Sequence, residues 1–153
     1  MKKIYYWSPH ISRVATIKNV FNSAVSLARY TSEKLDVSII DVFGEWKDLK
    51  EEMRSKNVNY IKLSKLDLSN FLPISGYFKG RLFYIFIFFF KILSLGKILK
   101  EKKPDYFIIH LITIMPLFLL LKNNYKTKFI LRISGLPKFN FLRKLLWKMV
   151  SKK

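Results

Sequence analysis

The chain has 153 residues and half of them are apolar, which suits one domain with a sizeable core and argues against disorder. It has no cysteine, so disulfides and thiolate metal sites are excluded, and its two histidines lack metal-ligand spacing. The formal net charge of +19 favours a phosphate-rich partner, such as nucleic acid, anionic lipid or a phosphorylated small molecule. A general bias of the sequence toward lysine is the alternative explanation.

Neither a secretory leader nor a membrane span is expected. The apolar residues after Met1 are interrupted early, by Ser8, Pro9 and His10. The segment from Leu82 to Leu95 is about 14 residues long, which is shorter than the roughly 20 that a spanning helix needs. We expect a buried or interfacial helix there, with the aromatic run 83–90 in the core rather than on a binding surface.

Strand-like and helix-like segments alternate along the whole chain. A loop is expected at 64–80, where glycine and proline recur. The expected strands are 3–7, 35–42, 57–63, 104–109 and 127–131, and the expected helices are 16–28, 46–54, 81–102, 113–123 and 139–149. In the last helix the predicted buried face is Leu142, Leu145, Leu146, Met149 and Val150.

This alternation predicts a single α/β domain, Rossmann-like, with a parallel sheet of about five strands between two helix layers. The expected strand order is 3-2-1-4-5. Ligands of such sheets bind beyond the carboxyl ends of the strands where the order reverses, here the first and fourth strands. Those ends carry Ser8 with His10, and His110. A second polar edge, 41–45, follows the second strand.

His110 is the most interesting ionisable residue, since a histidine at the end of a buried strand could act as a general base or orient a hydroxyl. A packed histidine bonded to a backbone carbonyl is the plainer interpretation. Arg132 with Ser134 could grip a phosphate or a sugar hydroxyl, or Arg132 could simply be solvated. A polar lip, or a plain turn, surrounds the first helix start: Ser8, His10, Ser12 and Arg13.

Common nucleotide-binding motifs are missing. The first strand-to-helix turn has no glycine, which argues against an NAD or FAD domain, and there is no P-loop sequence. No Gly-x-Ser-x-Gly elbow occurs either. We therefore expect neither a cofactor nor a metal on this chain.

Three segments resemble the amino-terminal half of bacterial GT-B glycosyltransferases of family 4, the type that builds capsular and other surface polysaccharides. They are residues 6–18, residues 37–46, and residues 104–110 continuing to 131–138. Each motif is weak alone, but their order and spacing make the match more specific. They span nearly the whole chain.

The resemblance implies half of a GT-B fold, whose acceptor-binding and donor-binding domains face each other across a cleft. Residues 1–153 match the acceptor side, and the donor-binding domain, with its nucleotide sugar and paired glutamates, is expected to be absent. Three departures stand out. Many relatives have a glycine-rich first turn, a second histidine where Ile112 stands, and a histidine before glycine where Ser134 stands.

The expected function is the acceptor-binding half of a retaining glycosyltransferase, which moves a sugar from a nucleotide sugar to a lipid-linked or polysaccharide acceptor. The chain would be peripheral at the cytoplasmic membrane face, on anionic lipid, and inactive alone. The alternative is a non-catalytic binding subunit or truncated remnant that docks a separate donor-binding chain. Nucleic acid is an unlikely partner, since no helix-turn-helix, RNA-recognition or zinc motif is present.

Overall fold

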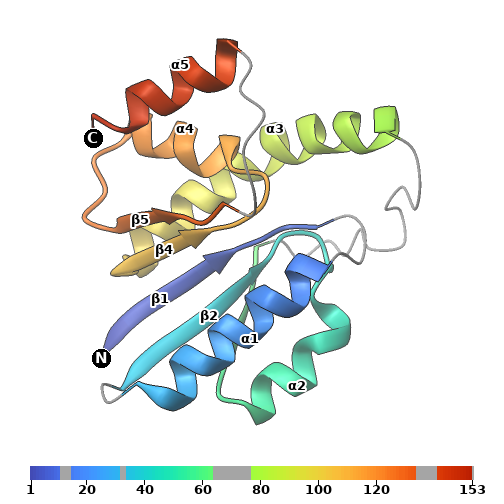
Figure 1. The fold of residues 1–153 in the computed structure, drawn as a ribbon, viewed down its shortest axis with the longest axis vertical. Coiled ribbons are helices and arrows are strands. Elements are labelled where there is room, and N and C mark those ends of the chain that lie inside the picture. The colour runs from blue at the N-terminus through green and yellow to red at the C-terminus, as the bar shows by residue number, and fades with distance from the viewer. Residues whose placement is uncertain (11–14, 32–33, 64–76, 134–140, 153) are drawn as a thin grey trace.

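The computed structural model describes residues 1–10, 15–31, 34–63, 77–133 and 141–152. These residues form a central five-stranded sheet with helices on both faces (Figure 1). The elements are β1 (Lys2–Trp7), α1 (Ala15–Tyr30), β2 (Leu35–Asp41), the 3-10 turn η1 (Lys47–Leu49), α2 (Lys50–Ser55), β3 (Asn59–Lys62), α3 (Tyr77–Lys102), β4 (Tyr106–Ile109), α4 (Ile114–Lys122), β5 (Lys128–Leu131) and α5 (Phe141–Val150).

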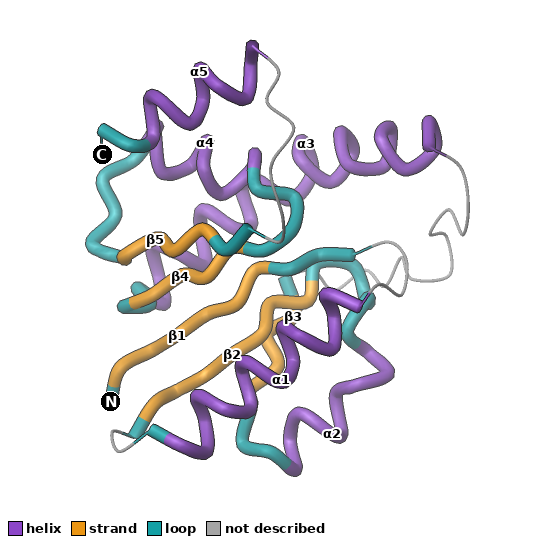
Figure 2. Tube along the Cα trace, viewed as in Figure 1, coloured by secondary structure: helices purple, strands orange, loops and turns teal. Residues whose placement is uncertain are grey.

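The sheet is parallel throughout and its strand order is β3-β2-β1-β4-β5, as predicted from the sequence. Trp7 at the end of β1 lies opposite Ile40 of β2 and Ile109 of β4. The carboxyl ends of β1 and β4 are therefore neighbours, at the point where the strand order reverses (Figure 2). The fold class expected from the sequence, a Rossmann-like α/β domain, is confirmed.

Alternate residues of the central strands supply two separate cores. Ile4 and Tyr6 of β1 pack on the side of α1 and α2. Tyr5 and Trp7 pack on the opposite side, against α3 and α4. Because helices cover both faces, the strands are nearly continuous apolar runs, as is usual for buried parallel sheets.

Helix α3 differs from its prediction, since it begins at Tyr77 within the segment expected to be a loop. The remainder of that loop, 64–76, lies outside the described residues. The core prediction for 83–90 is largely wrong, because Ile87 is buried whereas Phe89 and Phe90 are 68% and 65% exposed. The amino-terminal half of α3 projects past the sheet (Figure 1), so the described residues leave much of its surface uncovered. In the described part of the chain, no helix combines the length and the apolar character needed to cross a membrane.

Helix α5 lies against α4, and its buried face agrees with the prediction at Leu146 and Val150 but not at Leu145 and Met149. Leu146, Trp147 and Val150 pack on the core. Leu145 and Met149, which were predicted to be buried, are exposed. The side chain of Leu142 lies outside the described residues. The large indole ring of Trp147 takes a place on the core that the leucine spacing had assigned to smaller residues.

Replacing Gly96 with alanine should stabilise the domain. A Cβ atom on Gly96 would lie 3.5 Å from Leu119 Cδ2 and 3.8 Å from the Tyr125 hydroxyl, which are ordinary contacts. Because glycine inside a helix costs about 0.5–1 kcal/mol relative to alanine, we expect the free energy of unfolding of Gly96→Ala to rise by about that amount. Urea unfolding measures it, and a fall in stability would contradict the spacing between α3 and α4.

Candidate functional site

The ends of three neighbouring strands form the candidate site. The backbone N–H of His110, directly after β4, donates to the Trp7 carbonyl at 2.9 Å. The backbone N–H of Arg132, directly after β5, donates to the Ile109 carbonyl at 2.9 Å. These two bonds continue the parallel ladders by one residue, so His110 lies beside the end of β1 and Arg132 lies beside His110.

The imidazole of His110 is buried and faces the ring of Tyr6, with ring centres 6.2 Å apart and planes inclined by 23°. Neither of its ring nitrogens has a hydrogen-bond partner in the described structure. Burial, and secondly the positive charge of Arg132, lower the pKa of His110 to about 4. The ring is therefore neutral at pH 7, with one nitrogen free to accept a hydrogen bond and the other free to donate one.

Ser8, the residue after β1, is also buried, and its hydroxyl likewise lacks a partner among the described residues. Buried polar atoms are nearly always hydrogen-bonded, so two such groups at one strand junction call for an explanation. A bound hydroxyl or phosphate would supply the missing hydrogen bonds of Ser8 and His110.

His10 is turned toward β2. Its ring meets the indole of Trp46 edge-on, with centres 4.9 Å apart and planes at 88°. Its Nδ1–H donates to the Ser8 carbonyl at 3.3 Å. Burial lowers the pKa of His10, and this is partly offset by backbone hydrogen bonds to Ser8 and Glu45 and by the charge of Asp41. His10 is therefore also mainly neutral near pH 7.

A buried turn after β2 positions Trp46, the residue that His10 contacts. Asp41 Oδ1 accepts the backbone N–H groups of Gly44 and Trp46 at 3.1 and 3.0 Å, and Asp41 Oδ2 accepts the Tyr60 hydroxyl. The φ angle of Gly44 is 105°, a conformation that favours glycine. This turn holds the Trp46 ring against His10.

Glu45 completes the same turn. Its carboxylate accepts the backbone N–H groups of Val42 at 3.0 Å and Phe43 at 2.9 Å. Burial, followed by the charge of Asp41 and a hydrogen bond with it, raises the pKa of Glu45 well above its ordinary value. Glu45 is therefore easier to protonate than an ordinary exposed glutamate.

The remaining predicted site residues have different outcomes. Ser12, Arg13 and Ser134 lie outside the described residues. Arg132 is exposed at the sheet edge. Ile112, two residues after His110, has a left-handed φ of 48°, which is unfavourable for a β-branched residue, and its carbonyl accepts the Trp7 indole N–H at 3.2 Å.

The polar edge 41–45 is visible in the sequence, but neither its residues nor Tyr6 were predicted to belong to the site. The signal for this turn was an acidic residue ending a strand three positions before a glycine. Tyr6 gave no signal, because an aromatic residue in a buried strand is ordinary core.

The site favours binding over proton abstraction. An imidazole with a pKa of about 4 is a weak base, but it can orient a hydroxyl group, and the nearby guanidinium of Arg132 can attract an anion. The described residues contain no group of three or more histidine, cysteine, aspartate or glutamate side chains able to hold a metal ion.

No protein-family model matches the sequence, and no curated protein matches it. Among solved structures, the fold is similar to that of CalG4, the calicheamicin glycosyltransferase, with a TM-score of 0.58 and 13% sequence identity. The match covers 96% of this chain and 36% of CalG4, so this chain spans about a third of the length of that neighbour. At this identity the likeness concerns the fold: the chain has the Rossmann-like fold of a GT-B glycosyltransferase half-domain.

Proposed function

We propose that the chain is the acceptor-binding half of a GT-B glycosyltransferase of family 4, of the surface or capsular polysaccharide type. The intact enzyme would transfer a sugar from a nucleotide sugar to a lipid-linked or polysaccharide acceptor. The observation that carries the proposal is a pair of buried polar groups where β1 meets β4, Ser8 Oγ and the His110 ring, which have no hydrogen-bond partner among the described residues. The glycosyltransferase-like fold supports it.

In this proposal His110 accepts a hydrogen bond from the acceptor hydroxyl and orients it, and Ser8 holds a second polar group of the same ligand. Arg132 attracts the phosphate that links a sugar to its lipid. His10, Ser12, Arg13 and Ser134 complete the acceptor site. The nucleotide sugar binds elsewhere in the enzyme, on a donor-binding domain or chain.

The proposed location is the cytoplasmic face of the membrane, with the chain bound peripherally to anionic lipid. The exposed aromatic residues of α3, including Phe86, Phe89 and Phe90, support this. The net charge of +19 adds attraction to anionic headgroups.

Ser8→Ala tests the acceptor site, with Ser38→Ala as its matched control. Ser38 is also buried, within β2, but its hydroxyl already has a hydrogen-bond partner, since it donates to Asp36 Oδ1 at 3.5 Å. With farnesyl diphospho-N-acetylglucosamine as the probe, calorimetry should show about tenfold weaker binding for Ser8→Ala and for His110→Gln. Ser38→Ala should bind like the wild type.

Ser8→Ala should also unfold at the wild-type urea concentration, because its hydroxyl has no partner to lose in the described structure. Equal affinity of wild type and both site variants, or no binding of the probe by the wild type, would refute the acceptor site.

A second candidate is a non-catalytic subunit that docks a separate donor-binding chain. The observation that favours it is the outer face of α5, where Phe141 is 78% exposed and Leu145 and Met149 are also exposed. Co-purification with a donor-domain glycosyltransferase, lost in a Phe141→Ser/Leu145→Ser variant, would support docking. A chain that remains monomeric in the presence of that protein would count against it.

A further inference from the structure

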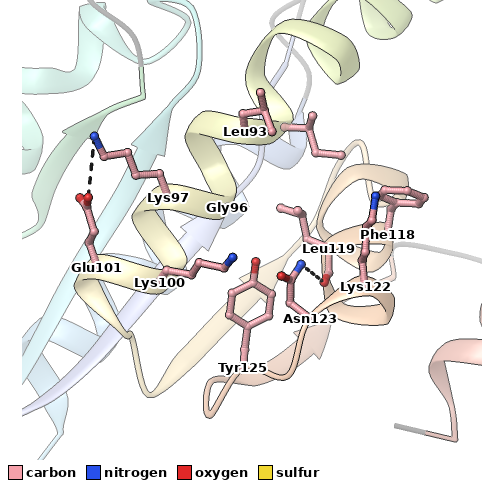
Figure 3. A pocket seen from close by; sticks show the side chains of 11 residues that line it. Leu93, Gly96, Lys97, Lys100, Glu101, Phe118, Leu119, Lys122, Asn123 and Tyr125 are labelled. Atoms are coloured by element: carbon pink, nitrogen blue, oxygen red, sulfur yellow. Dashed lines mark hydrogen bonds and ion pairs between the residues drawn. The ribbon is translucent and has the colours of Figure 1, made fainter.

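A groove of about 540 Å³ lies between α3 and α4, on the helix layer and away from the strand ends that form the candidate site (Figure 3). Its walls are apolar and come from both helices, with Leu93 on α3 and Phe118 and Leu119 on α4. The absence of a side chain at Gly96 leaves space between these walls.

One end of the groove is cationic. Lys97 is paired with Glu101 at 3.8 Å, so the acidic residue of the groove is already neutralised. Lys100 has no ion pair with any described residue, and Figure 3 shows it extending toward Tyr125. Lys122, on the α4 wall, adds a second positive charge to the groove, but its Nζ lies beside Phe118, 5.8 Å from the ring centre, and not beside Tyr125 (Figure 3).

The Tyr125 hydroxyl is buried at this end and has no hydrogen-bond partner in the described part of the molecule. Burial raises the pKa of Tyr125, so the hydroxyl remains protonated and can donate. A buried donor without an acceptor destabilises a folded protein. An anionic oxygen between Lys100 and Tyr125 would satisfy it.

The other end of the groove is apolar and continues onto the surface of α3. Leu93 is 81% exposed, and one turn before it lie the exposed rings of Phe89 and Phe90. Phe90 in turn packs on Phe86, with ring centres 4.4 Å apart. The cationic end of the groove is therefore continuous, through Leu93, with a stripe of exposed aromatic side chains on α3.

We propose that this groove binds one molecule of an anionic phospholipid. Its phosphate lies beside Lys100 and accepts a hydrogen bond from Tyr125, while its acyl chain follows Leu93 toward Phe89, and Lys122 adds positive charge at the α4 wall of the same groove. Lysines in the last turn of a helix can serve merely to offset the helix dipole. That role explains neither the unpartnered hydroxyl nor the adjoining apolar wall. The site is independent of the acceptor site proposed above.

Binding of monomeric dihexanoyl phosphatidylglycerol to the purified chain tests the proposal, with dihexanoyl phosphatidylcholine and inorganic phosphate as comparison ligands. Tyr125→Phe should weaken binding of phosphatidylglycerol about fivefold, without loss of stability, because it removes only the unpartnered hydroxyl. Lys100→Glu/Lys122→Glu should weaken it at least about tenfold.

Lys18→Glu/Lys34→Glu is the matched control, since it makes the same change in net charge at exposed lysines away from α3 and α4. It should leave the affinity within about twofold of the wild type. Equal losses in both double variants would show a general charge effect and overturn the proposal. So would equal affinity for phosphatidylcholine, equal affinity for inorganic phosphate, or no binding of phosphatidylglycerol. Binding of the sugar-bearing probe by Ser8 and His110 is a separate measurement, so either proposal can fail alone.

Discussion

Replacing Asp41 with alanine is expected to lower the free energy of unfolding by about 3–5 kcal/mol, a large part of the 5–15 kcal/mol typical of a domain. Asp41 is fully buried at the end of β2. Its carboxylate accepts the N–H groups of Gly44 and Trp46 and the hydroxyl of Tyr60. Alanine would remove the carboxylate that accepts these three hydrogen bonds. Urea unfolding followed by tryptophan fluorescence measures the loss.

Asp41→Asn is the control for charge. Its side-chain oxygen can still accept the two backbone N–H groups, so the expected loss is smaller, about 1–2 kcal/mol. It also removes the negative charge that raises the pKa of Glu45, so that pKa should fall toward its ordinary value. If Asp41→Ala were within about 1 kcal/mol of the wild type, the turn would not hold Trp46 and His10 as described.

The second large effect is a loss of stability on acidification that depends on His110. The pKa of His110 falls from its ordinary value of 6.5 to about 4 in the folded chain. Between these values the unfolded chain binds a proton that the folded chain does not. The contribution of His110 to stability is therefore complete above about pH 6.5 and is lost as the pH falls toward 4.

His110→Gln should remove this part of the pH dependence, because glutamine keeps a polar side chain but does not titrate. Urea midpoints measured between pH 4 and pH 7 for wild type and variant isolate the effect. Glu45 has the opposite effect on the pH dependence of stability. Because its pKa is raised in the folded chain, it contributes stability at low pH that is lost as the pH rises above the ordinary carboxyl range. His10→Gln serves as a comparison, since burial also lowers the pKa of His10. Parallel curves for wild type and His110→Gln would contradict the buried, neutral ring.

A ligand phosphate at the candidate site would change this titration. A negative charge beside His110 favours the protonated ring, so bound acceptor should raise the pKa of His110. Arg132, which lowers that pKa in the free chain, would pair with the same phosphate. A histidine resonance that moves on addition of the farnesyl-linked probe would therefore report binding at the strand ends directly.

The strand order and the placement of Ser8, His110 and Arg132 at neighbouring strand ends could be predicted from the sequence because they follow from local patterns and one topological rule. Apolar runs ending in polar residues marked the strands, and their alternation with helices made the sheet parallel. In a parallel sheet the carboxyl ends lie at one edge, so Ser8, His110 and Arg132 had to be close in space. No knowledge of side-chain packing was needed for this step.

Tertiary structure decided the exposure of individual faces and the partners of individual polar atoms. The aromatic run of α3 has the composition of a core segment, but the helix extends beyond the sheet, and Phe89 and Phe90 contact rings of their own helix and remain largely exposed. His10 lies on Trp46, and Glu45 shares a turn with Asp41, because the loop after β2 folds back over its own strand. A sequence pattern indicates whether a segment is a helix or a strand. Which of its side chains are buried or hydrogen-bonded depends on the elements that pack against it, and those come from distant parts of the sequence.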